Sequence, residues 1–363
     1  MSTLIAPVRN LWFEKITSPN RIRLYVWLSL ATQILIVVTG GLVRLTGSGL
    51  GCPTWPKCTD ESLVSTAEMG IHGIIEFGNR LLTFVLLIVA ALTFITLFRQ
   101  SAAKEQLKPI IISFFAFVLL FVGALVLAVR AIDLISISAL VLSGLGILGT
   151  ALLFVVRAKQ AKSISTLVPA FGLGFGIIMQ AVVGGITVLT ELNSWIVGLH
   201  FVISSYLIAL ASVLVYRALP KQFGVVNPAA TALRIPVVLG GALTILVGVV
   251  VTGAGPHAGD AMTPRNGFDL ELWQHFHSYP GYLMLGLILL QLVLQRRSDS
   301  SWVASYTNRA LVLLLAVSVA QAIVGVVQAR MGVPPFLVAL HMLGAAVLSS
   351  LLTFQYLATK QRA

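Results

Sequence analysis

Ten apolar runs of roughly twenty residues each extend along this 363-residue chain, and they constrain its fold more than any other feature. The runs do not alternate apolar with polar residues, so they indicate helices rather than strands. Only 10% of the residues are charged and 58% are hydrophobic, whereas about 25% of a soluble domain is charged. A helix satisfies its own backbone polar groups inside a bilayer. The sequence therefore predicts an all-α polytopic membrane protein. The expected spans are 24–43, 72–98, 109–129, 134–156, 166–188, 195–217, 235–254, 277–295, 310–329 and 335–357.

The basic residues are distributed asymmetrically along the chain. If the N-terminus lies inside, all but six of the 24 Lys and Arg fall in segments on that same side. This positive-inside pattern predicts a multi-pass protein of the cell (plasma) membrane with both termini in the cytoplasm. Topology thereby accounts for the net charge of +12, so the lipid bilayer is the expected partner and nucleic acid is not.

One stretch occurs twice, and its copies align without a gap. Gln180-Ala-x-Val-Gly precedes His200, and Gln321-Ala-x-Val-Gly precedes His341, with twenty residues from Gln to His in both copies. The ends of the first and seventh spans are also similar, and a long outer loop follows each of them. This repeat predicts two tandem four-helix bundles related by a pseudo-two-fold axis along the membrane normal.

The repeat also suggests a division of the chain. We expect a cytoplasmic N-terminus at 1–23, an N-terminal bundle at 24–218 and a C-terminal bundle at 235–357. Two spans within 109–156 have no counterpart in the second half and predict an inserted helical hairpin. The hairpin contains no His, Glu or Cys, which indicates a peripheral packing or partner element.

Three histidines, His200, His277 and His341, are expected at one depth near the outer ends of their helices. Ionisable groups inside a bilayer usually indicate function, although a single buried His is often a packing residue. No intramembrane Cys pair, His-Glu-x-x-His motif or carboxylate cluster favours zinc or di-iron. Imidazoles from facing helices suit a six-coordinate haem, and interfacial arginines could bind its propionates or simply snorkel. Those arginines are Arg44, Arg80, Arg265 and Arg330.

The other histidines lie in different settings. His257 lies in a Gly-Pro-His-Ala-Gly-Asp loop sequence, which favours a loop or propionate contact over axial ligation. His275 is two residues from His277, so the two side chains point to different faces of a helix.

Glu76 is the carboxylate within the apolar spans that surface exposure does not explain. His72, Glu76 and Arg80 are spaced at four-residue intervals, which places them on one stripe of a helix. Glu76 could pair with Arg80 to hold the helix end, or it could handle a proton or stabilise charge beside a substrate.

The chain has two cysteines, Cys52 and Cys58, both in the first long outer loop. An oxidising exterior favours a disulfide there over two free thiols.

Several segments that contain the residues discussed above are similar in sequence to the haem A synthase family. The resemblance rests on Thr39 to Cys52, Trp55-Pro56-x-Cys58, Ile75 to Arg80, Gly184 to Leu189 before His200, Gly255 to Asp260, and Leu340-His341. It covers nearly the whole chain outside the hairpin. It implies an oxidoreductase that oxidises the C8 methyl of haem O to a formyl group, making haem A for terminal oxidases.

The resemblance also implies roles for individual residues. His277 and His341 would ligate a haem b cofactor, and His200 would face the substrate haem. Glu76 matches a mechanistically important glutamate, and Cys52–Cys58 matches an outer-loop disulfide. The implied partners are haem O, a haem O synthase, and a membrane or soluble electron carrier.

The chain departs from the family pattern on one helix. The pattern Glu-x-x-His-Arg has Asn79 in place of its histidine here, and asparagine is a poor iron ligand. The substrate haem would then be five-coordinate through His200, which we favour, or would take His72 as a second ligand. The additional hairpin is the other departure, since eight spans are usual.

Two further functions are compatible with the sequence. Paired histidines on helices would also fit a b-type membrane cytochrome that only relays electrons. The repeated architecture would suit a haem transporter or chaperone. The asymmetry between the halves, with Glu76 in one half only, favours the synthase.

Overall fold

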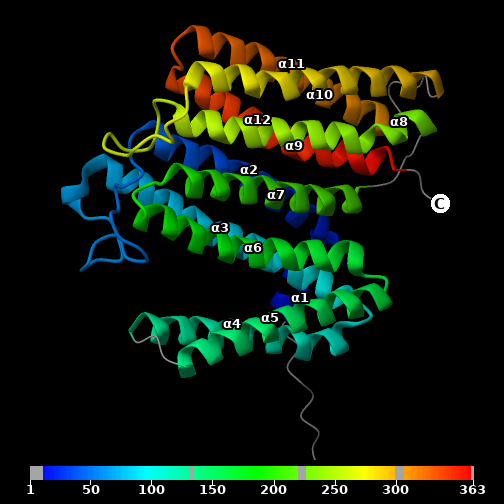
Figure 1. The fold of residues 1–363 in the computed structure, drawn as a ribbon. Helices are drawn as coiled ribbons and strands as arrows, with labels where there is room; N and C mark the ends of the chain where they lie inside the picture. Colours follow the sequence, from blue (N-terminus) through cyan, green and yellow to red (C-terminus); the bar gives the residue numbers. More distant parts are fainter. Residues whose placement is uncertain (1–10, 131–133, 220–225, 299–305, 361–363) are drawn as a thin grey trace, which may run out of the picture. The chain divides into compact units, whose positions relative to one another are not determined.

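The computed structural model describes residues 11–130, 134–219, 226–298 and 306–360, and the regular elements in these ranges are all helices (Figure 1). They are α1 (Leu11–Ile16), η1 (Pro19–Arg21), α2 (Ile22–Leu45), η2 (Ala67–Met69), α3 (Gly70–Gln100), α4 (Lys104–Arg130), α5 (Leu134–Gln160), α6 (Ile164–Leu189), α7 (Ser194–Ala218), α8 (Pro228–Ala232), α9 (Arg234–Ala254), α10 (Leu270–Ser298), α11 (Tyr306–Arg330) and α12 (Pro335–Ala358). Within the described residues, ten helical segments are long and apolar enough to cross a membrane. The predicted all-α polytopic membrane fold with ten spans is confirmed.

The largest departure from the expected boundaries is at the start of α10. This helix begins at Leu270 rather than at 277. The side chain of Asp269 caps it by accepting a hydrogen bond from the Leu272 amide at 2.7 Å. The first two turns carry polar residues, which lowered the hydropathy and concealed the helix start. As a result His277 lies about two turns inside the helix.

The larger of two compact units comprises 23–91 and 172–363. Within it α9, α10, α11 and α12 pack in a ring of four around an apolar core, and α7 packs on α9 and α12. The core residues are Val237, Met284, Ile288, Leu314, Leu348 and Leu352. We refer to α9–α12 as the C-terminal half and to α2, α3, α6 and α7 as the N-terminal half.

Both long loops of this unit, 46–69 and 255–269, lie at one end of it, on the left in Figure 1. We call this the loop end. The amide of Gly49 donates to the carbonyl of Gly259 at 2.9 Å, so the two loops are joined directly. The predicted site residues all belong to this unit.

The turns that join α6 to α7 and α11 to α12 have the same backbone conformation. The amides of Leu192 in the first turn and Val333 in the second donate to the carbonyl five residues earlier, at 2.7 and 2.8 Å. The residue before each has a positive φ, 51° at Glu191 and 74° at Gly332. This is the hydrogen-bond pattern of a Schellman motif at a helix C-terminus. The duplicated sequence therefore folds into the same helix–turn–helix element twice. The pseudo-two-fold axis and the two-bundle division stay predictions.

The smaller unit comprises 1–22 and 92–171, described from residue 11. In it α4 packs along α5, which forms the predicted hairpin. Its core combines aliphatic side chains with a group of aromatic rings, in which the ring of Phe171 lies 4.9 Å from that of Phe114 and 4.7 Å from that of Phe154. The peripheral role of the hairpin stays a prediction.

Candidate functional site

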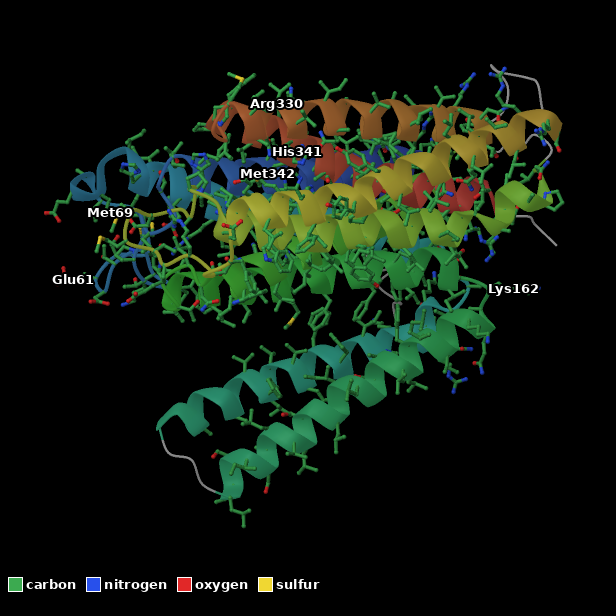
Figure 2. All side chains as sticks on the ribbon, turned by 45° about the horizontal axis from the view of Figure 1, so that its top comes forward. Glu61, Met69, Lys162, Arg330, His341 and Met342 are labelled. Atoms are coloured by element: carbon green, nitrogen blue, oxygen red, sulfur yellow. A yellow bond between two sulfur atoms is a disulfide. The ribbon has the colours of Figure 1, made fainter. Side chains whose placement is uncertain are left out.

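His277 of α10 and His341 of α12 lie next to each other in the C-terminal half. Their ring centroids are 6.2 Å apart and their planes make an angle of 77°. His277 Nδ1 lies 2.9 Å from the carbonyl oxygen of Thr244, so a neutral ring donates from Nδ1 and keeps Nε2 as an acceptor. Figure 2 labels His341 and its neighbour Met342 on α12.

This pair has a separation suited to a shared metal. Two imidazoles on opposite sides of one iron would have ring centres about 6 Å apart, because each metal–nitrogen bond is about 2 Å long. The His277–Thr244 bond is also typical, since a ligating histidine usually donates its other ring N–H to a carbonyl or carboxylate. His341 Nδ1 is buried and has no hydrogen-bond partner among the described residues. The residues therefore fit a haem with two axial histidines, although the ligand assignment itself stays a prediction.

His200 of α7 occupies the matching position in the N-terminal half. Its imidazole lies against Gly184 of α6, where an added Cβ would be 3.3 Å from Cε1. Gln180, one turn earlier on α6, donates from Nε2 to the His200 carbonyl at 2.8 Å. Within the described structure His200 Nδ1 is buried without a partner.

The two alternatives for a second ligand in this half have other partners. Asn79 Oδ1 accepts a hydrogen bond from Thr39 Oγ1 at 2.8 Å, which ties the amide to α2. His72 is exposed, and its Nδ1 lies 2.8 Å from Ser48 Oγ. It lines a cavity of about 430 Å³ at the loop end, together with Asp260 of the other long loop. No described contact joins either residue to His200. The prediction of a five-coordinate substrate iron is compatible with this arrangement.

Glu76 and Arg80 form an ion pair one turn apart on α3, one of the two alternatives that the sequence left open, with Arg80 Nη2 2.5 Å from Glu76 Oε1. The other carboxylate oxygen, Oε2, accepts a hydrogen bond from the amide of Cys52 at 2.6 Å. Glu76 is only 5% exposed, so this charge is desolvated as well as paired. The pair therefore forms a buried ionic contact beneath the first long loop.

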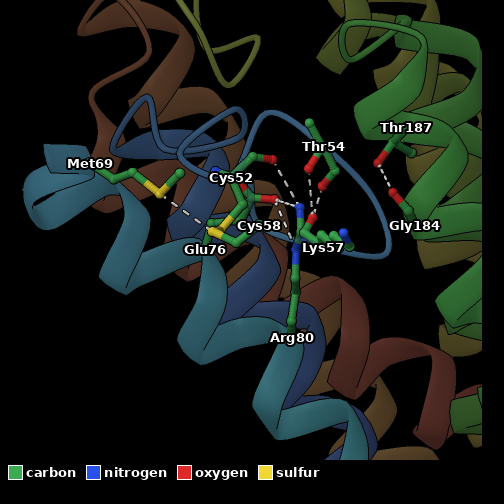
Figure 3. Close-up of polar contacts among 9 residues, drawn as sticks. All are labelled: Cys52, Thr54, Lys57, Cys58, Met69, Glu76, Arg80, Gly184 and Thr187. Carbon is green, nitrogen blue, oxygen red and sulfur yellow. Dashed lines mark hydrogen bonds and ion pairs between the residues drawn. A yellow bond between two sulfur atoms is a disulfide. The ribbon is translucent and has the colours of Figure 1, made fainter. Parts of the chain in front are cut away.

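Arg80 also binds the loop itself, as Figure 3 shows. Its guanidinium donates to the carbonyls of Cys52, Thr54 and Lys57 at 3.0, 3.1 and 3.2 Å. The planar fork of arginine suits several oxygens at once. Three carbonyls and one carboxylate thus converge on one side chain, and the loop is held to α3.

The loop is closed by a disulfide between Cys52 and Cys58, as the sequence favoured. Both cysteines are fully buried, and Cys58 Sγ is 3.4 Å from Met69 Sδ. The ring of Trp55, at the loop's tip, occupies the space that a side chain on Gly185 of α6 would need. The loop therefore bridges α3 and the helix on which His200 rests.

The arginines predicted near propionates all bind backbone or lie exposed. Arg44 Nη2 donates to the carbonyl of Thr252 at 2.7 Å, while its Nε is buried without a described partner. Arg265 donates to two carbonyls of its own loop, and Arg330 is exposed. Their role toward a propionate stays a prediction, with Arg44 the one that has an unused buried donor.

The two remaining histidines are placed as expected from their settings. His257 Nε2 lies 2.8 Å from the carbonyl of Val333, so it anchors the second long loop to the α11–α12 turn. His275 is exposed on a different face of α10 from His277. Neither is brought to the His277–His341 pair by a described contact.

Several contacts at the site were not predicted from the sequence. Thr244, which orients His277, acts through its backbone, so its side chain carries no signal. Trp55 and Gly185 meet only because the loop folds back on α6. The glycines beside the histidines had a signal, because Gly184 and Gly325 both belong to the duplicated stretch.

The fold and the site together define a polytopic helical membrane protein with histidines between neighbouring helices and a buried ion pair beneath a disulfide loop. Residues 23–134 match the sequence profile of the COX15-CtaA family, described as cytochrome oxidase assembly protein. In this segment the chain is similar to that family, and the segment makes up less than a third of the chain. The matched segment contains the cysteine pair, Glu76, Asn79 and Arg80, whereas the three bundle histidines lie outside it.

Two relatives carry the name haem A synthase. The chain is 29% identical over 92 residues to the protein from Geobacillus thermodenitrificans, a stretch that is 25% of this chain and 27% of the relative. It is 33% identical over 97 residues to the protein from Exiguobacterium sibiricum, 26% of this chain and 31% of the relative. The chain thus spans less than a third of the length of the relatives it matches.

Proposed function

We propose that the protein is a haem A synthase, an oxidoreductase that converts the C8 methyl of haem O into the formyl group of haem A. His277 and His341 hold a haem b cofactor in the C-terminal half, and His200 ligates the substrate haem in the N-terminal half. The observation that carries the proposal is that the histidines of the two copies have different neighbours. His341 has a second imidazole 6.2 Å away, whereas His200 has Gly184 and no imidazole among its described contacts.

Bound haem b would supply the redox chemistry that protein side chains cannot perform alone. The chain's own residues bind and position. His277 is oriented by the Thr244 carbonyl, so its Nε2 is available to a metal. In the N-terminal half, Glu76 is held by donors on both oxygens, which fixes the carboxylate relative to α3 and the loop. We assign Glu76 to proton handling or charge stabilisation beside the reacting methyl.

The environment of the protein follows from the same proposal. Haem O is hydrophobic and comes from a haem O synthase, and a membrane or soluble carrier exchanges the electrons. The excess of Lys and Arg on one side supports a plasma-membrane location with both termini in the cytoplasm. The loop end, with its disulfide, then faces the oxidising exterior.

The test is to express the full chain with a haem O source and to analyse the extracted haems. Haem A is expected from the wild type and is expected to disappear in Glu76→Gln and in His200→Ala. Glu68→Gln and His275→Ala are matched controls, because both residues are exposed, Glu68 in η2 just before α3 and His275 in the second turn of α10. Haem b without any haem A in the wild type would contradict the proposal.

A relay cytochrome is the second candidate, because the His277–His341 pair by itself would serve it equally well. The same extraction separates the two functions. A relay would contain haem b, leave added haem O unchanged, and transfer electrons equally well in the wild type and in Glu76→Gln.

A further inference from the structure

The duplicated stretch does more than carry a histidine in each copy. In both copies a Gln-x-x-x-Gly segment on one helix lies against the histidine of the next helix. We call this segment the seat; it comprises Gln180 and Gly184 on α6, and Gln321 and Gly325 on α11. The Schellman turns that follow the two seats also match in their hydrogen bonds and backbone conformation.

The glycines of the two seats touch the imidazoles. A Cβ added to Gly184 would be 3.3 Å from His200 Cε1, and one added to Gly325 would be 3.4 Å from His341 Cε1. The first separation is shorter than ordinary van der Waals contact between carbons, and the second lies at its lower limit. An alanine at position 184 would therefore push its ring by a few tenths of an ångström, and an alanine at position 325 would leave its ring no clearance. Binding sites must hold their geometry to about 0.5 Å, so such a shift is functionally large.

The glutamines of the seats fix the backbone just beyond each histidine. Gln180 Nε2 donates to the His200 carbonyl at 2.8 Å and to Ser204 Oγ at 2.5 Å. The amide of Gln321 fills the space that a side chain on Gly344 would need. Each glutamine thus contacts the turn that follows its histidine, one by hydrogen bonds and the other by close packing.

The hydrogen bonds of the histidines show why a seat is needed. His277 has a Thr244 carbonyl to fix its ring rotation. His200 and His341 lack such an anchor, since Nδ1 of each is buried without a partner among the described residues. Without that bond, packing contacts limit the rotation of these two rings, with Gly184 beside His200 and with both Gly325 and the His277 ring beside His341.

We propose that Gly184 with Gln180, and Gly325 with Gln321, are positioning residues that set the ring orientation of the haem-ligating histidines His200 and His341. The inference rests on the proposed function, because it assumes that both histidines ligate haem. It predicts that the two seats act separately, Gly325 on the resident haem and Gly184 on the substrate haem.

The experiment compares purified full-length wild type, Gly325→Ala and Gly184→Ala. Gly286→Ala on α10 and Gly174→Ala on α6 are matched controls, because a Cβ at either position meets nothing within 4 Å. The readouts are the optical and electron paramagnetic resonance spectra of the resident haem and the affinity for added haem O. Gly325→Ala is expected to shift the resident-haem spectra and weaken haem b retention about tenfold, which is typical for loss of a residue that orients a ligand. Gly184→Ala is expected to leave those spectra unchanged and weaken haem O binding about tenfold.

The outcomes separate this inference from the proposed function. Wild-type spectra and wild-type haem O affinity in both variants would overturn the seats while leaving the function intact. A wild-type protein that binds no haem would overturn the function itself. If Gly325→Ala does not fold, Gln321→Asn decides, because it withdraws the amide from Gly344 without adding bulk. A resident-haem spectrum unchanged in a folded Gln321→Asn would then contradict the inference.

Discussion

The two copies of the Gln-to-His element share their backbone and differ in what surrounds the histidine. In the C-terminal half His341 lies beside a second imidazole that a backbone carbonyl orients. In the N-terminal half His200 has no such neighbour among its described contacts, and the loop held by Arg80 reaches α6, the helix against which His200 lies, through Trp55. The element therefore determines where a histidine is placed, and the surrounding segments determine what that histidine can do. The following predictions test this difference, beginning with the largest expected effect.

Removing the histidine of one copy should release the resident haem, whereas removing the histidine of the other copy should not. His341→Ala is expected to lose nearly all bound haem b, because it removes one of the two proposed haem ligands. His200→Ala should retain it and lose only the capacity to bind haem O. The haem content of purified protein, measured by the pyridine haemochrome method, checks both expectations. Equal haem b loss in the two variants would mean that the halves are equivalent.

Arg80 lies in the N-terminal half, and its removal should destabilise the protein strongly. Arg80→Met leaves the carboxylate of Glu76 buried without its cation, which costs about 3 kcal/mol. The thermal unfolding midpoint in detergent should fall accordingly, and Arg80→Met with Glu76→Gln should recover part of the loss. Arg330→Met is the matched control, because Arg330 is exposed at the end of its helix. Equal midpoints for Arg80→Met and the control would contradict the expectation.

Opening the disulfide should have a smaller effect than removing Arg80. The cysteines are six residues apart, so the chain-entropy model assigns about 2 kcal/mol to this loop. The double variant Cys52→Ser, Cys58→Ser keeps the three carbonyl contacts of Arg80, and we expect it to stay folded with haem b bound. Unfolding in denaturant measures the change, and chemical reduction of the wild type should reproduce it. A larger loss than for Arg80→Met would show that the disulfide rather than the arginine holds the loop.

Asn79→His should reduce the difference between the halves. An imidazole at position 79 would be available as a second ligand beside His200 for the substrate iron, although Thr39 would lose its hydrogen bond to Asn79. We expect haem O to bind about tenfold more tightly, or about 1.4 kcal/mol, with a low-spin spectrum. Titration of the purified variant with haem O measures this, and Asn79→Ala controls for the loss of the Thr39 bond. High-spin haem O at wild-type affinity would show that α3 cannot reach the iron.

The helical architecture was predictable because a bilayer allows few alternatives. An apolar run of twenty residues has to become a helix, whatever its detailed packing. The start of α10 was misplaced because Trp273, His275 and their polar neighbours resemble a loop by hydropathy. The cap formed by Asp269 became evident only from the structure.

The site was predictable where it depends on helical spacing. Glu76 and Arg80 are one turn apart, so their ion pair was one of the two stated possibilities. The capture of loop carbonyls by Arg80 was not predictable, because it depends on how residues 52–58 fold. The bond from Thr39 to Asn79 likewise depends on how α2 and α3 pack, which no pattern within either helix encodes.

The matching turns have a consequence for how the chain can change in length. Each histidine follows its glycine at the same sequence interval in both copies. The hydrogen bonds of the Schellman turn between them fix the conformation of the connection. One residue inserted into the turn would rotate the following helix by about 100°, carrying the imidazole to another face. The twenty-residue interval from glutamine to histidine therefore sets the position of the histidine on its helix. An insertion or a deletion within it would misplace the histidine and, with it, the proposed iron ligand.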